Sequence, residues 1–144
     1  MRPFAAATPS ARKEGTLDEH EHHDQVMADL GDQLAEILET SDQGVYVYLD
    51  DVHKLCNARF ASLLGYASSA EWAAVRQPFP MVFVAPESRD ALISAYQDAM
   101  ERRVGSVSDV TWLTRTGGRV ETSVILVPIA LHGEPVALHF VEPR

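Results

Sequence analysis

The chain has 144 residues, 46% of them hydrophobic, and its 21 acidic side chains outnumber the 12 basic ones to give a formal net charge of −9. Ten acidic and three basic side chains fall in residues 1–43, so most of the negative charge belongs to the N-terminal segment. This charge balance argues against binding to nucleic acid or to an acidic membrane surface. No apolar run reaches the roughly 20 residues of a membrane helix. With a single cysteine and no secretory leader pattern, we expect one cytoplasmic domain.

The N-terminal segment divides into two parts. Residues 1–16 lack apolar periodicity, and we predict a disordered arm there. Over residues 17–40 the apolar residues fall at helical spacing, which predicts an amphipathic helix with one narrow stripe. This stripe is a candidate homodimer interface, and it comprises Val26, Leu30, Leu34, Ile37 and Leu38.

A β-rich run begins at Gly44 with the sequence "GVYVYLD". The pair Asp50-Asp51 predicts a turn, and "VHKLC" predicts a second short strand. Asn57 is a favoured N-cap for a short helix that ends at Gly65. The chain therefore leaves the sheet at Asn57.

Two further helices follow this first short one. Ser68 and Glu71 have the spacing of a capping box, and "QPFP" ends the short helix that they begin. The longest helix begins at "APES" and closes at Gly105. We expect its apolar face to consist of Leu92, Ile93, Tyr96, Met100 and Val104.

Three strands complete the chain. The paired glycines Gly117-Gly118 predict the turn between the first two, and His132-Gly133 predicts the turn into the last. The middle strand contains "VILVPIAL", which is apolar on both faces. Because a sheet covered on one side keeps alternating, we expect the N-terminal helix or a second copy of the chain to cover the other side.

The order of these elements resembles the PAS domain family. "GVYVYLDDVHKLCNARFASLLGY" looks like the family's opening strands and the helix after them, and "VAPESRDALISAYQDAMERR" is similar to its long connecting helix. "WLTRTGGRVETSVILVPIALHGEPVALHFVE" resembles its final hairpins. The resemblance implies an α+β fold over residues 41–144, with a five-stranded antiparallel sheet, helices on one face, and an N-terminal amphipathic helix.

By resemblance, such domains sense small ligands, bind haem or flavin, or associate with proteins. We expect a single-domain signalling module without its own effector domain, which forms a homodimer and contacts a small-molecule ligand or a signalling protein. Residues of the kind expected to line a ligand pocket are more often packed core than ligand contacts. The residues expected to line such a pocket here are Phe60, Leu64, Tyr66, Trp72, Phe83, Ile93, Tyr96 and Trp112.

The sequence leaves the cofactor unknown. Haem-binding relatives place a histidine on the long helix, and "PESRDALISAYQDAMERR" has none, which disfavours that mode. Cys56 precedes Asn57 in a context unlike the reactive cysteine of flavin photosensors, so we interpret it as a small hydrophobic residue and disfavour covalent flavin. His53 and His139 lie on predicted strands, and we interpret them as partly buried histidines rather than iron ligands.

The cluster "EHEHHD", residues 19–24, has the composition of a zinc or nickel site. Structural metal sites usually draw ligands from two elements, and no second cluster supports this one. We therefore interpret it as the solvated face of a helix and predict no metal.

We find no pattern of an enzyme. No nucleophile is spaced with a base, and "TGGR" is too short to form a phosphate-binding loop. The alternative that stays open is a cone-shaped α+β enzyme of the ketosteroid-isomerase type, acting on an apolar ring substrate. In that hypothesis Asp109 is the general base, and Tyr46 or Tyr66 donates to the oxyanion.

Overall fold

The computed structural model describes residues 16–144, with side chains from Glu19 onward. The predicted arm lies outside the described residues, except for Thr16, at which the first helix begins. The helices are α1 (Thr16–Gln33), α2 (Ala35–Thr40), α3 (Ala58–Leu63), α4 (Ser69–Ala73), α5 (Phe79–Phe83) and α6 (Pro86–Arg102). The strands are β1 (Gly44–Tyr48), β2 (Lys54–Cys56), β3 (Ser106–Leu113), β4 (Arg119–Leu131) and β5 (Glu134–Pro143).

The five strands form one sheet in the order β2-β1-β5-β4-β3, and every neighbouring pair is antiparallel. The two longest strands are β4 and β5. They pair over the whole length of β5, from Leu131↔Glu134 beside the turn to Thr122↔Pro143. β5 therefore lies at the centre of the sheet, between β1 and β4. The five-stranded antiparallel sheet expected from the sequence is confirmed.

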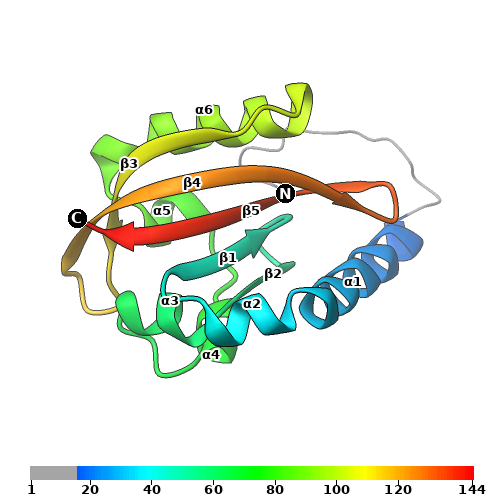
Figure 1. The fold of residues 1–144 in the computed structure, drawn as a ribbon, viewed down its shortest axis with the longest axis horizontal. Helices are drawn as coiled ribbons and strands as arrows, with labels where there is room; N and C mark the ends of the chain where they lie inside the picture. The colour runs from blue at the N-terminus through cyan, green and yellow to red at the C-terminus, as the bar shows by residue number, and fades with distance from the viewer. Residues whose placement is uncertain (1–15) are drawn as a thin grey trace.

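The inner face of the sheet packs against the helices α3 to α6 (Figure 1). Alternate residues of β1, among them Tyr46 and Tyr48, point into this layer. Phe60, Trp72 and Trp112 are fully buried there, and they pack ring against ring. This aromatic layer is the main core of the molecule.

The outer face of the sheet packs against α1. Val26 and Leu30 are buried against Val45, Val47 and Leu138, which belong to β1 and β5. Figure 1 shows α1 and α2 along the side of the molecule away from α6. The N-terminal helix thus covers part of the second face, which explains why "VILVPIAL" does not alternate.

Both N-caps predicted from the sequence are confirmed, although the Glu71 carboxylate accepts from the N–H of Ala67 rather than of Ser68. The Asn57 side chain accepts a hydrogen bond from the backbone N–H of Phe60, 2.9 Å away, and caps α3. The same oxygen accepts from the N–H of Val45 at 3.0 Å, so the cap also fixes α3 to β1. Ser68 caps α4 by accepting from the N–H of Glu71. Gly65 follows α3 with a φ of 85°, a conformation that a glycine adopts without strain.

Four predicted boundaries were wrong. The N-terminal helix breaks at Leu34 into α1 and α2. α6 ends at Arg102 because Arg103 turns left-handed, with a φ of 59°, so Val104 leaves the apolar face and is 49% exposed. β2 has only three residues, since the turn before it extends to His53. The segment predicted as the end of a helix contains the additional helix α5, which begins directly after Pro78.

Candidate functional site

The residues predicted to line a ligand pocket form the packed inner core. All eight belong to one apolar cluster, six of them buried and Tyr66 and Ile93 partly buried. The ring of Phe60 lies 4.8 Å from that of Tyr46 and 5.3 Å from that of Trp112, measured between centroids. The structure thus brings the eight residues together in one layer, and their role as the walls of a ligand pocket stays a prediction.

Two buried polar atoms face this core without a hydrogen bond to any described residue. They are Nε1 of Trp72 and Nδ1 of His139. The His139 ring stacks on Tyr46 with centroids 3.9 Å apart. Burial lowers the pKa of His139 from its ordinary 6.5 to about 3, so its imidazole is neutral at physiological pH.

A groove of about 480 Å³ lies on the surface where α2, α3 and the end of β5 meet. Its walls include the apolar residues Leu38, Leu63 and Pro143, and the charged residues Glu39, Asp42 and Arg59. None of the predicted pocket residues lines it. Half of its lining residues are polar or charged, whereas small-molecule sites are mostly apolar.

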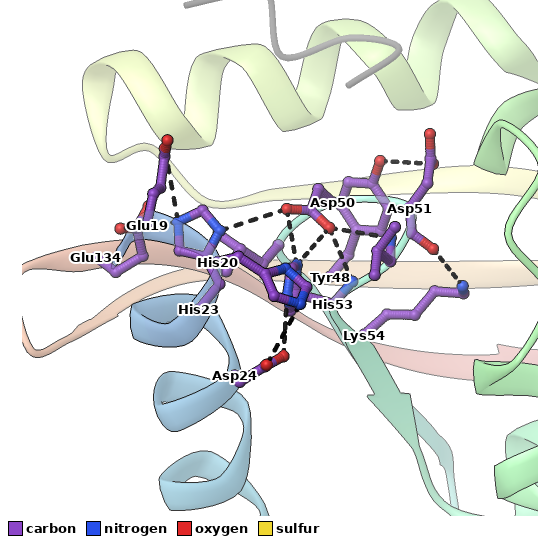
Figure 2. Close-up of polar contacts among 12 residues, drawn as sticks. Glu19, His20, His23, Asp24, Tyr48, Asp50, Asp51, His53, Lys54 and Glu134 are labelled. Atoms are coloured by element: carbon purple, nitrogen blue, oxygen red, sulfur yellow. Dashed lines mark hydrogen bonds and ion pairs between the residues drawn. The ribbon is translucent and has the colours of Figure 1, made fainter. Parts of the chain in front are cut away.

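The third candidate region is a cluster of histidines and carboxylates where α1 meets the β1–β2 turn. We call it the helix junction, and it consists of His20, His23, Asp24, Asp50, His53 and Glu134. Figure 2 shows these side chains converging from α1, from the turn and from the start of β5. α1 contributes three of these residues, His20, His23 and Asp24, which lie within five consecutive positions.

His23 joins two carboxylates at the junction. It is only 4% exposed, and its Nδ1 lies 3.5 Å from Asp50 while its Nε2 lies 3.3 Å from Glu134. Hydrogen bonds to Asp50 and Glu134 raise the pKa of His23 to about 9, against the opposing effect of burial. Burial alone would raise the pKa of Asp50, but the histidines His23 and His53 outweigh it and hold that pKa well below its usual range. A buried imidazolium therefore links α1 to the β1–β2 turn and to β5.

His53 occupies the turn itself. Asp50 Oδ1 accepts hydrogen bonds from the backbone N–H groups of Val52 and His53, which closes the turn. The Nδ1 of His53 lies 2.9 Å from the same oxygen, and its Nε2 points the other way, 3.1 Å from Asp24 of α1. The turn thus aims one imidazole at two acidic groups on different elements.

Two groups of residues at the junction have atoms close enough to hold one ion. The first is His20, Asp24 and His53, and the second is His23, Asp50 and His53. In each group the ligand atoms lie within 4.8 Å of one another. Each group combines one or two residues of α1 with the turn.

The other polar residues of the turn have a structural role. Lys54 donates from Nζ to the backbone carbonyls of Asp51, Ala73 and Val75, and burial lowers its pKa to about 8. The Asp51 side chain accepts from the hydroxyl of Tyr48 and from a backbone N–H of α5. These bonds fasten the turn to the segment around α4 and α5.

Most residues of the helix junction stand out in the sequence, but nothing there connects them. The interpretation of residues 19–24 as a solvated face is wrong at His23, which is buried, although His20 and Asp24 are exposed. Glu134 was missed. One argument from the sequence could have found the cluster. A helix that covers the outer face of β1 places its polar residues beside the turn that follows β1.

The residues of the alternative enzyme do not come together. Asp109 has an exposed side chain on the edge strand β3 and lies 3.8 Å from Arg144. Tyr46 is buried in the inner core, and Tyr66 packs against Phe83. The groove between α2, α3 and β5 is lined by none of these three residues, so the isomerase arrangement is not supported.

Searches of family profiles and of curated proteins give no match for the chain. Solved structures do match it with high probability. A PAS domain of a protein from Colwellia psychrerythraea is 19% identical with a TM-score of 0.62, covering 78% of this chain and 95% of that one. The chain has the PAS fold.

Two more PAS-fold structures extend the comparison. A sensory box histidine kinase/response regulator from Burkholderia thailandensis is 16% identical over 78% of this chain and 83% of that one, with a TM-score of 0.56. The PAS-B domain of Drosophila melanogaster Cycle, with bound ethylene glycol, is 8% identical over 70% and 99%, with a TM-score of 0.58. At such identities the likeness establishes the fold and leaves the ligand open. Within residues 16–144, no helix has the length and apolar character needed to cross a membrane.

Proposed function

We propose that the chain is a PAS signalling module that pairs with a second copy through the outer face of its sheet and signals through the docking of α1 on that face. The PAS fold and the similarity to a domain of a sensory box histidine kinase support a role in signalling. The observation that carries the proposal is that α1 covers only part of the outer face.

The uncovered part of the outer face lies on β3 and β4. Val107 is 72% exposed and Ile125 is 41% exposed, and the two residues are register partners on neighbouring strands. The same face is closed by α1 over Val45 and Val47 of β1. An apolar pair beside an already covered strip fits a protein partner, and the self-complementary surface of a twofold dimer is the commonest way to cover it.

The helix stripe predicted as the dimer interface has another use in this arrangement. Val26 and Leu30 are buried within the same chain, and Leu34 and Leu38 are partly buried there. Ile37 alone of the stripe is exposed. A second copy on β3 and β4 would therefore lie beside α1 rather than take its place, and a change in α1 docking would reach the interface through the shared sheet.

The test is the mass of the purified chain in solution over a range of concentrations. We expect a dimer, and Val107→Glu should shift it to monomer because it places a carboxylate at the centre of the proposed interface. Val104→Glu is the matched control, since Val104 is also an exposed valine but lies beyond the end of α6. A dimer that survives Val107→Glu, or a wild-type chain that is monomeric throughout, contradicts the proposal.

Small-ligand sensing is the second candidate function. The orphaned Nε1 of Trp72 and Nδ1 of His139 favour it, because buried polar atoms usually find a partner. A ligand acceptor beside Trp72 would satisfy its indole N–H, and a polar ligand group beside His139 would satisfy Nδ1. Native mass spectrometry with an absorbance spectrum tests this candidate: added mass or colour supports a ligand, and a bare chain that binds no member of a small aromatic library argues against it.

A further inference from the structure

We propose that the helix junction is a site for a divalent transition metal ion, with His20 and Asp24 of α1 and His53 of the β1–β2 turn as its ligands. The ion would fasten the N-terminal helix to the sheet. The metal site does not depend on the proposed function. Only the effect of the ion on signalling rests on that function.

The three side chains are near enough to close on one ion. One ligand atom from each lies within 4.8 Å of the others, and the two shortest contacts use different oxygens of Asp24. Nε2 of His20 lies 3.4 Å from Asp24 Oδ2, and Nε2 of His53 lies 3.1 Å from Asp24 Oδ1. Ligand atoms about 2.0–2.1 Å from a zinc ion at tetrahedral angles lie about 3.3 Å from one another. The pair His20 and Asp24, four residues apart, presents both groups from one face of a helix. Figure 2 shows Asp24 below the rings of His20 and His53, with dashed lines from its carboxylate to both.

The decisive observation concerns Nε2 of His53. The residue is only 6% exposed, and this nitrogen makes no hydrogen bond with any residue that the structure describes, although Asp24 is within 3.1 Å. The contact has the distance but not the direction of a hydrogen bond. A buried nitrogen aimed at an exposed histidine and an exposed carboxylate is what a metal ligand looks like before the ion binds.

Asp50 supplies the support that metal-binding histidines usually have. Its carboxylate lies 2.9 Å from Nδ1 of His53, and the backbone N–H of His53 fixes the same oxygen. A proton on Nδ1 donated to Asp50 leaves the lone pair of His53 on Nε2, where the ion would sit. Carboxylate–histidine–metal triads of this kind orient the ring and strengthen its binding.

The neighbouring group of His23, Asp50 and His53 is the weaker candidate. Both nitrogens of His23 already face carboxylates, Asp50 at 3.5 Å and Glu134 at 3.3 Å. An ion there would have to displace these contacts and be dehydrated in a buried place. His20 and Asp24 are exposed, so an ion has a path to them from solvent.

Two imidazoles and one carboxylate favour zinc among the divalent ions, and nickel, cobalt and copper bind similar sets. Three protein ligands leave a fourth position for water. Because the ligands come from α1 and from the turn, the ion would lower the rate at which α1 leaves the sheet.

The experiment is a zinc titration of the untagged full chain after treatment with a chelator, followed by calorimetry and by elemental analysis of dialysed protein. We expect one zinc per chain. His20→Ala and Asp24→Asn should each weaken binding by about tenfold or more, and both side chains are exposed, so the fold is not at risk. His22→Ala is the matched control, because His22 belongs to the same sequence cluster but to neither ligand group, and its affinity should match the wild type.

Three results would overturn the site: no saturable zinc binding, equal affinity in all three variants and the wild type, or loss of binding in His23→Gln but not in His20→Ala. The last result would assign the ion to the buried group. Hydrogen exchange separates the site from its consequence. Zinc should slow exchange in α1 of the wild type and not of Asp24→Asn; tight zinc binding that leaves α1 exchange unchanged would keep the site and refute its control of helix docking.

Discussion

Asn57 holds three backbone groups at the point where the chain leaves the sheet. Its Oδ1 accepts from the N–H of Phe60 and of Val45, and its Nδ2 donates to the carbonyl of Gln43. Asn57→Ala removes a helix cap and leaves buried backbone groups without partners, so it should lower the free energy of unfolding by about 2–3 kcal/mol. Urea unfolding measures this loss. Asn57→Asp keeps the accepting oxygen and should cost clearly less; equal losses in the two variants would contradict the role of the shared cap.

His139 gives the stability a pH dependence that one substitution can isolate. Burial lowers the pKa of His139 from 6.5 to about 3. Its ring stacks on the ring of Tyr46, and burial raises the pKa of that tyrosine. On the other side, His139 of β5 is the register partner of Leu126 of β4. The unfolded chain therefore binds a proton below pH 6.5 that the folded chain refuses. The stability associated with the neutral ring is complete above pH 6.5 and falls by up to about 1.4 kcal/mol per pH unit as the pH drops toward 3.

His139→Phe keeps the stack and removes the titration. Its stability, compared with the wild type in urea at pH 7.5 and pH 4.5, should fall less on acidification. Because the other titrating groups are common to both proteins, they cancel in the comparison. A difference between the two proteins that is the same at both pH values would show that the ring is protonated in the folded chain.

At the scale of elements, α6 ends by a left-handed residue that is not glycine. Arg103 has a φ of 59° and its N–H bonds to the carbonyl of Ala99. Arg103→Gly should raise the free energy of unfolding by about 0.5–1 kcal/mol, because only the strain of a side chain in this conformation is removed. Arg102→Gly, one residue earlier within the helix, should lower it by about 1 kcal/mol. Thermal unfolding checks the position of the helix end: the midpoint should rise in Arg103→Gly and fall in Arg102→Gly. A shift of the same sign in both variants would contradict this position.

The elements that the sequence predicted well carry a local signal at each end. α3 has Asn57 before it and Gly65 after it, and the β3–β4 and β4–β5 turns have glycines at positive φ. The elements that it predicted poorly lack such a signal. α5 begins directly after Pro78, in a segment whose prolines predict the end of a helix. α6 ends at Arg102, where the sequence has no glycine or other helix-ending residue. Where a boundary depends on packing, as at Leu34, the periodicity alone cannot place it.

At the scale of the whole molecule, the sequence predicted the sheet and the need to cover its second face. It did not predict the helix junction that forms where α1 covers that face. The histidines of residues 19–24 and the turn at Asp50 were each visible, about 30 residues apart in the chain. Their meeting depends on the angle at which α1 crosses β1, which side-chain packing of Val26 and Leu30 decides. The predicted pocket residues were correctly recognised as apolar, but composition does not distinguish a lined cavity from a filled core.

The proposed signalling role requires α1 to open before the rest of the molecule does. α1 is attached through two fully buried apolar side chains, Val26 and Leu30, each worth about 1.5–3 kcal/mol, and through the helix junction. β5 is paired on both edges and buried on both faces, so it should open only on global unfolding. We therefore expect native-state hydrogen exchange to give protection factors in α1 at least about tenfold lower than in β5. Exchange in α1 should also depend little on low concentrations of urea. Equal protection in α1 and β5, with the same urea dependence, would mean that the helix and the sheet open as one unit, and α1 docking could not then carry a signal.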